Sequence, residues 1–136
     1  MTGRYEVCSE KTVGEAELAE REKLAEQVTQ KLLLAGFTPS RRGAFPGSGG
    51  FQVNVDFAAD AHGGVFVTWH TSESLRDEAI ASKLSGEESP SLEYFRSLTK
   101  IMQSAMIEVL SAAGWHACDA ANDMNPYAIR VEDREK

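Results

Sequence analysis

Two short segments on either side of a glycine-rich turn alternate apolar and polar side chains. The apolar positions are Phe51, Val53, Val55, Phe57, Val65, Val67 and Trp69. Because successive side chains of a β-strand point to opposite faces, each segment has one apolar and one polar face. The alternation predicts two half-buried strands, at about 51–58 and 64–70, that form the central hairpin of the domain.

The register of this hairpin is restricted by the same pattern. A shift of one residue would move every apolar side chain of one strand to the opposite face, so odd residues must pair with odd residues. We expect, for example, Val55 opposite Val67. The same register places Val53 opposite Trp69, and the connecting loop then holds an odd number of residues.

Three segments have helical periodicity. Residues 14–35 combine strong helix formers with apolar residues three and four positions apart, and Gly36 offers a left-handed cap. A short helix is expected at about 73–84. A second long helix, at about 90–113, opens with a serine and a proline, which is a favourable start for a helix.

The apolar stripe of this last helix is wide. Its members are Leu92, Phe95, Leu98, Met102, Ala105, Val109 and Ala113, widened by Tyr94, Ile101, Met106, Ile107 and Leu110. A helix that is apolar over so wide an arc needs cover on two sides. Two alternatives follow, namely cover by the sheet and another helix, or cover by a second subunit.

Three weaker strands complete the expected elements. Residues 37–42 form a short strand that Pro39 confines to an edge of the sheet, because proline has no backbone N–H. A short strand is expected at 115–118, and 127–131 alternates as a last strand.

The resulting order, α-β-β-β-α-α-β-β, predicts an α+β fold in a single domain spanning 1–136. An antiparallel sheet of about four to five strands is packed by two long helices and one short helix. Residues 1–12 and 133–136 are expected to be flexible tails.

This order of elements is similar to that of the small dimeric chaperones of type III secretion and their bacterial relatives, which are also short and acidic. The resemblance spans residues 14 to 132 and implies a chaperone-like topology. Because one fold supports many functions, it adds little about what the chain does.

Composition narrows the classes of function. The chain has 136 residues, 42% of them hydrophobic, which is enough for a core without metal or disulfide support. Its net charge of −7 disfavours nucleic acid as a partner. No apolar run approaches the ~20 residues of a membrane helix. Met1 to Val13 lacks the apolar core of a secretory signal, and Cys8 and Cys118 lie far apart, so we expect a soluble, cytoplasmic protein with reduced thiols.

The polar face of the hairpin is the first candidate site, as a face for a ligand or a partner. It comprises Gln52, Asn54, Asp56, Phe66, Thr68 and His70. An imidazole near a carboxylate, here His70 and Asp56, is the minimum for general acid–base chemistry. No nucleophile is identifiable, so we predict no catalytic residue and no cofactor.

A second candidate is an anion-binding loop containing Arg41, Arg42, Gly47 and Gly49, whose alternative is a plain connector because the Walker pattern is absent. His116 and Cys118, with Asp119 or Asp123, are the best candidates for metal ligands. They lack a second closely spaced pair, so no metal site is predicted.

These observations favour a small, acidic, non-enzymatic protein-interaction module, such as an adaptor, a chaperone-like protein or a regulatory protein, that forms a homodimer. The alternative is a small-ligand-binding protein or enzyme with a site between Asp56 and His70 and the loop from Arg41 to Gly50. Nucleic-acid binding through Arg41 and Arg42 ranks below both.

Overall fold

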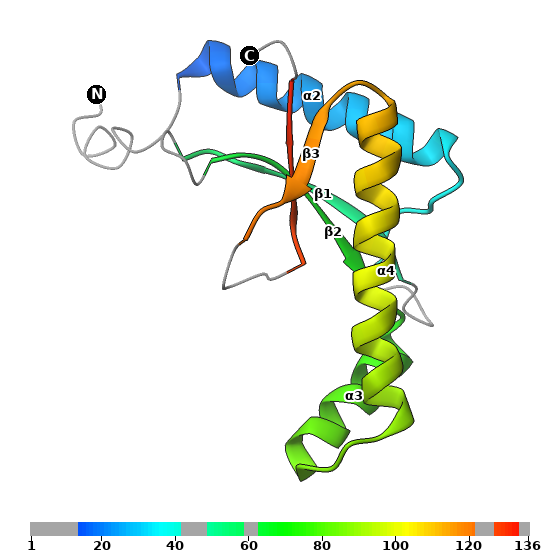
Figure 1. Cartoon of the computed structure of the whole chain (residues 1–136). Helices are drawn as coiled ribbons and strands as arrows, with labels where there is room; N and C mark the ends of the chain where they lie inside the picture. Colours follow the sequence, from blue (N-terminus) through cyan, green and yellow to red (C-terminus); the bar gives the residue numbers. More distant parts are fainter. Residues whose placement is uncertain (1–13, 42–48, 59–62, 122–126, 134–136) are drawn as a thin grey trace, which may run out of the picture.

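The protein is an α+β domain built on one four-stranded antiparallel sheet (Figure 1). The computed structural model describes residues 14–41, 49–58, 63–121 and 127–133. Its elements are α2 (Glu15–Leu34), β1 (Gly50–Asp56), β2 (Gly64–His70), α3 (Glu73–Ser85), α4 (Pro90–Ala112), β3 (His116–Asp119) and β4 (Ile129–Glu132). The predicted fold class and helices are confirmed, whereas the expectation for residues 1–12 lies outside the described residues.

The hairpin of β1 and β2 pairs odd residues with odd residues, as predicted. Val53 lies opposite Val67 and Val55 opposite Val65, so residues 57–63 separate the strands. The register given as the example, with Val55 opposite Val67, is therefore wrong by two residues. A shift of two residues keeps every side chain on its face, so the apolar pattern could not distinguish these registers.

The prediction of an edge strand at 37–42 is wrong for the described part of this segment. Within its described part, the segment forms an isolated parallel bridge between Pro39 and Phe51 at the outer edge of β1. The Phe51 N–H donates to the Thr38 carbonyl, and the Ser40 N–H donates to the Phe51 carbonyl, both at 2.9 Å. Pro39 limits further pairing because it has no N–H to donate.

The apolar face of the hairpin is covered by the two long helices. α2 packs on β1 and β2, α4 packs on β2, β3 and β4, and the helices also contact each other. The fully buried side chains are Val28, Leu32, Val65, Val67, Met106, Leu110 and Ile129, with Val131 nearly so. The odd face of the hairpin is therefore the floor of the core, except for Phe57, which lies beyond the end of β1 and is 51% exposed.

The sheet order is β1-β2-β4-β3. β4 pairs with β2 on one side and with β3 on the other, both antiparallel. Val131 lies opposite Val65 in β2 and opposite Ala117 in β3, and these side chains extend the apolar floor across the sheet.

Helix α3 contacts only α4 among the described elements. Together, α3 and the N-terminal half of α4 form an arm that extends away from the sheet (Figure 1), which we call the α3–α4 arm. Each helix begins at a serine whose hydroxyl accepts a bond from the backbone three residues later, Ser72 for α3 and Ser89 for α4. The Ser82 hydroxyl donates to the Ser89 hydroxyl at 2.5 Å, which ties the two helices together near their connection.

No helix in the described ranges is both long and apolar enough to cross a membrane.

Candidate functional site

The predicted polar residues of the hairpin share one face of the sheet, opposite to the core. Cross-strand pairing joins Asn54 to Phe66, Phe66 to Arg130 and Arg130 to Cys118, so these four form one row across all four strands. Antiparallel partners that lie directly opposite have side chains on the same face. The candidate face therefore extends beyond the hairpin to β4 and β3, and Arg130 stands at its centre.

The proposed acid–base pair of His70 and Asp56 is not formed. His70 lies opposite Gly50 and Asp56 opposite Gly64, at the two ends of the hairpin. Six residues along a strand correspond to roughly 20 Å, too far for proton transfer between the two side chains. The correction follows from the strand direction, because residues that share a face can still lie at opposite ends of it.

Each of the two side chains has a local partner instead. His70 Nε2 lies 2.6 Å from Gln52 Oε1, and the Gln52 amide donates to Asn54 Oδ1 at 3.4 Å. The Asp56 carboxylate accepts the Ala58 N–H at 2.9 Å. These bonds hold side chains at both ends of the face.

Arg130 was not predicted, and it organises the middle of this face. Its guanidinium carbon lies 4.9 Å from the centroid of the Phe66 ring, a cation–π contact. Its Nη1 donates to the Gly63 carbonyl at 2.8 Å and lies 3.7 Å from the Glu132 carboxylate. The sequence signal is weak, because alternation in the last strand shows that Arg130 is on the polar face but not which ring lies beside it.

Arg21 of α2 was also missed, because an arginine among glutamates on a helix is typical of a solvated surface. Its side chain is only 13% exposed. Nη1 donates to the carbonyls of Asp56 at 2.6 Å and Ala58 at 2.9 Å, while Nη2 pairs with Glu17 at 3.1 Å. Arg21 therefore fastens α2 to the end of β1.

Replacing Arg21 with alanine is expected to lower the free energy of unfolding by about 1–3 kcal/mol, because two charge-assisted bonds to backbone carbonyls are lost. Lys23, which is exposed on the same helix, supplies the control, and its replacement by alanine should change stability by less than about 0.5 kcal/mol. Urea unfolding measures both. Equal effects for the two variants would contradict the fastening role of Arg21.

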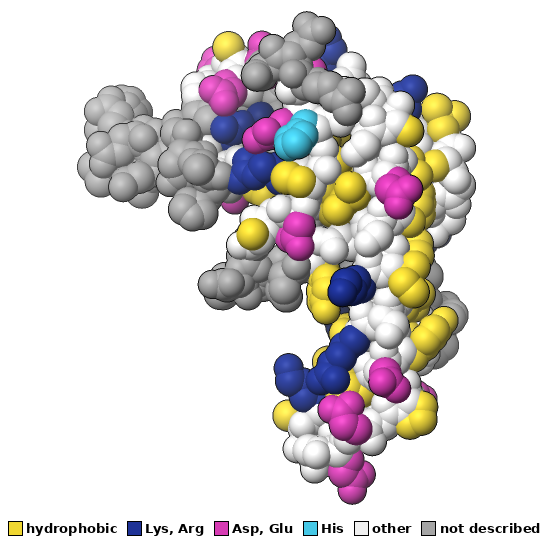
Figure 2. All heavy atoms as spheres, in the orientation of Figure 1, with side chains coloured by type: hydrophobic (Ala, Val, Ile, Leu, Met, Phe, Trp, Pro, Cys, Tyr) yellow, Lys and Arg dark blue, Asp and Glu magenta, His cyan; other side chains and the backbone are white. Residues whose placement is uncertain are grey.

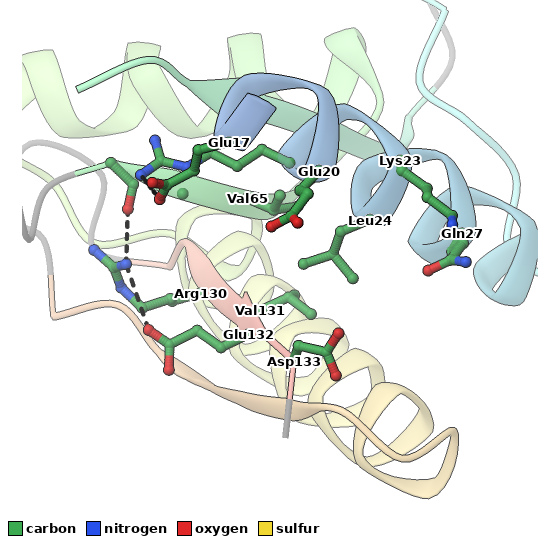
Figure 3. A pocket seen from close by; sticks show the side chains of 13 residues that line it. Glu17, Glu20, Lys23, Leu24, Gln27, Val65, Arg130, Val131, Glu132 and Asp133 are labelled. Carbon is green, nitrogen blue, oxygen red and sulfur yellow. Dashed lines mark hydrogen bonds and ion pairs between the residues drawn. The ribbon is translucent and has the colours of Figure 1, made fainter. Parts of the chain in front are cut away.

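A groove of about 650 Å³ lies beside Arg21, between α2 and β4 (Figure 3). Apolar side chains of Leu24, Val65 and Val131 contribute to its lining. The carboxylates that line it are Glu17, Glu20, Glu132 and Asp133, and the cationic side chains are Arg21, Lys23 and Arg130. Arg21 pairs with Glu17 and Arg130 with Glu132, so protein groups already engage both arginines of the groove.

The predicted anion loop is only partly described. Arg41 is exposed, whereas Arg42 and Gly47 lie outside the described residues. Gly49 packs against the backbone that connects β2 to α3, where a Cβ would lie 2.9 Å from the Ser72 nitrogen. Close packing of two backbone segments therefore accounts for Gly49 without a ligand.

The candidate metal ligands do not converge. Nowhere in the described ranges do three or more His, Cys, Asp or Glu side chains gather closely enough to hold a metal ion. His116 and Cys118 share the face of Arg130, whereas Asp119 pairs with Ile129 on the core side of the register. Asp123 lies outside the described residues.

Among the described residues, seven large apolar side chains are exposed, and four of them lie on α3 and α4. The other three are Leu33 and Leu34 at the end of α2 and Phe57 just after β1. Tyr94 is 58% exposed, Ile101 60%, Ile80 47% and Leu84 83%. Figure 2 shows apolar side chains along the right-hand side of α4. The wide stripe that the sequence predicted is thus covered on one side by the sheet and α3, and uncovered on the other.

Comparison with protein-family models, with curated proteins and with solved structures finds no match. The resemblance in element order to the type III secretion chaperones gains no support from these comparisons.

Proposed function

We propose that this chain is a non-enzymatic protein-interaction module that docks its partners, a second copy included, through the outer side of α4. The observation that carries the proposal is the pair Tyr94 and Ile101, two large apolar side chains that are more than half exposed two turns apart on one helix. Large contiguous apolar surface is typical of interaction sites.

The division of α4 into sides supports this assignment. Residues three, four and seven apart lie on the same side of a helix. The buried side contains Leu92, Thr99, Gln103, Met106 and Leu110. The polar side contains Glu93, Arg96 and Lys100, all exposed. Tyr94, Leu98, Ile101 and Ala105 occupy a third side, which is apolar although the fold leaves it wholly or partly exposed.

Contact with water does not explain why the third side of α4 is apolar. A helix that only covers its own sheet needs one apolar stripe, and the rest of its surface is usually polar. In α4, apolar residues occupy the outer side as well as the buried side. A partner that covers the outer side would remove this apolar surface from water, which is the main favourable term in protein association.

The alternative is a small-ligand-binding protein or enzyme. Its site was to include His70 paired with Asp56, but these residues are far apart, so its remaining support is the groove beside Arg21. Nucleic-acid binding rests on Arg41 and Arg42, of which only Arg41 is described. A cytoplasmic location and reduced thiols are part of the proposal, because an adaptor or chaperone-like protein of this acidic composition needs neither export nor disulfides.

Replacing Ile101 with glutamate is expected to weaken association at least tenfold, because a carboxylate would be buried in an apolar contact. Association is measured as the sedimentation coefficient of the purified protein over roughly a hundredfold range of concentration, together with the proteins it retains from an extract of its source cells. If the outer side of α4 binds every partner, self-association and the retention of other proteins should weaken together.

Lys100→Gln is the matched control. It changes the net charge by the same amount, at the neighbouring exposed position, but on the polar side of α4. This variant should associate like the wild type, and both variants should keep the wild-type circular dichroism spectrum and urea midpoint. If Ile101→Glu associates as strongly as Lys100→Gln, the outer side of α4 is not the docking surface.

A further inference from the structure

The outer side of α4 has the spacing of a helix-pairing seam. Its residues are Tyr94, Leu98, Ile101, Ala105 and Glu108, separated alternately by four and three positions. This is the repeat with which two α-helices pack along each other, each side chain fitting between those of the facing helix. We call these five positions the α4 seam.

Both flanks of the α4 seam repeat every seven residues. Ser97, Ser104 and Ser111 follow one flank, and Phe95, Met102 and Val109 follow the other. Serines allow the backbone of a second helix to approach closely, while the opposite flank adds apolar contact area. A seam with two consistent flanks is suited to a helix rather than to an extended peptide.

From this seam we infer that the partner is a second copy of the chain, bound so that the two α4 helices run antiparallel about a two-fold axis between Leu98 and Ile101. The inference rests on the proposed function and names its partner. In this arrangement Leu98 of each copy faces Ile101 of the other, and Tyr94 of each faces Ala105 of the other.

The sizes of these side chains favour the antiparallel orientation. The four layers formed by Tyr94, Leu98, Ile101 and Ala105 then contain either one large and one small residue or two of medium size, so these layers fill evenly. A parallel pair would place Tyr94 against Tyr94 and Ala105 against Ala105, which crowds one layer and leaves a gap in another.

Charge disfavours the parallel orientation. Glu108 is exposed at the C-terminal end of the α4 seam. In a parallel pair the two Glu108 carboxylates would face each other, which is unfavourable for like charges in a low-dielectric contact. In the antiparallel pair they lie at opposite ends, roughly 25 Å apart at 1.5 Å per residue.

The interface is of modest size. The α4 seam and its flanks supply about ten residues per copy, roughly half of the number in a standard interface. We therefore expect a dimer that dissociates on dilution, with a mass of twice 14.9 kDa at high concentration.

Cysteine cross-linking tests the orientation in full-length protein whose own cysteines are replaced by serine. A mixture of Tyr94→Cys and Ala105→Cys chains should form disulfide-linked dimers containing one chain of each kind. Neither variant alone should cross-link, because identical positions lie roughly 16 Å apart along an antiparallel pair. Cross-linking of Tyr94→Cys with itself, or no cross-linking in the mixture, would overturn the inference.

A size exchange gives a second, independent test. Ala105→Tyr alone should weaken dimerisation at least tenfold, because two tyrosines then meet in each outer layer. Adding Tyr94→Ala to the same chain should restore it, since each layer again pairs one large with one small residue. Absence of this rescue, in variants with wild-type circular dichroism, would exclude the antiparallel register.

The two proposals fail in different ways. If Ile101→Glu loses partners while the purified wild-type chain stays monomeric, the interaction function stands and the second copy is not the partner. If Ile101→Glu loses nothing, both proposals are wrong.

Discussion

Replacing Leu110 with alanine is expected to lower the free energy of unfolding by about 3–5 kcal/mol. The Leu110 side chain is 0% exposed and belongs to the core cluster between α4 and the sheet. Truncation removes buried apolar atoms and leaves a cavity that the rigid sheet cannot close, and Leu→Ala changes at such sites typically cost about 2–5 kcal/mol. Urea unfolding followed by circular dichroism measures the change.

Leu84 provides a control with the same chemical change. It lies in α3, near the end of the α3–α4 arm, and is 83% exposed. Leu84→Ala should alter stability by less than about 0.5 kcal/mol, because alanine also favours the helix and little contact is lost. Similar losses for Leu110→Ala and Leu84→Ala would mean that the core is not where the structure places it.

Replacing Gly50 with alanine is also expected to lower the free energy of unfolding by about 3–5 kcal/mol. Gly50 begins β1 with φ of +152°, which L side chains rarely adopt. It is also buried against the segment that bridges to β1, where a Cβ would lie 2.7 Å from the Pro39 carbonyl carbon and the Ser40 nitrogen. Both obstacles are backbone, so neither can move aside as a side chain does.

Gly86 is a control that separates the effect of backbone strain from the effect of a steric clash. It caps α3 with φ of +77°, and a Cβ added there would have no heavy atom of another segment within 4 Å. Gly86→Ala should therefore cost only the backbone strain, about 1–2 kcal/mol. Hydrogen exchange at the Phe51 and Ser40 amides, which form the bridge at the edge of β1, should accelerate in Gly50→Ala and not in Gly86→Ala. Equal behaviour of the two variants would contradict the steric explanation.

Local patterns in the sequence were sufficient for the helices and the hairpin. The capping serines, the glycine that ends α3 and the alternation around Val53 and Val67 each depend on residues close in the chain. The pairing of odd residues with odd residues in the hairpin followed from the same local rule, because only this pairing keeps the apolar side chains on one face.

Apart from the exact hairpin register, the features that the sequence did not predict depend on contacts between distant residues. The position of β4 beside β2 joins residues such as Ile129 and Val67, and no local pattern specifies that pairing. The roles of Arg21 and Arg130 depend on carbonyls of the hairpin loop more than thirty residues away. An isolated arginine in sequence gives no indication of which backbone it will bind.

The candidate polar face was predicted as a set of residues, and the structure places them on one face. Their interpretation changed because the strand direction separates His70 from Asp56, and because Arg130 lies against Phe66 at the centre. For the wide apolar helix, the structure shows that the sheet and α3 cover one side of α4. Cover of the other side by a second subunit stays a proposal.

The position of β4 in the sheet also bears on the order in which the chain can fold. β4 is the last strand of the described chain, yet it lies between β2 and β3. The edge of β2 that faces β4 stays unpaired until Ile129 and Val131 reach it, and these residues lie far from β2 along the chain. Pairing across so long a separation is slow and leaves strand edges exposed to aggregation in the meantime. Joining β3 to the hairpin in one sheet therefore depends on β4.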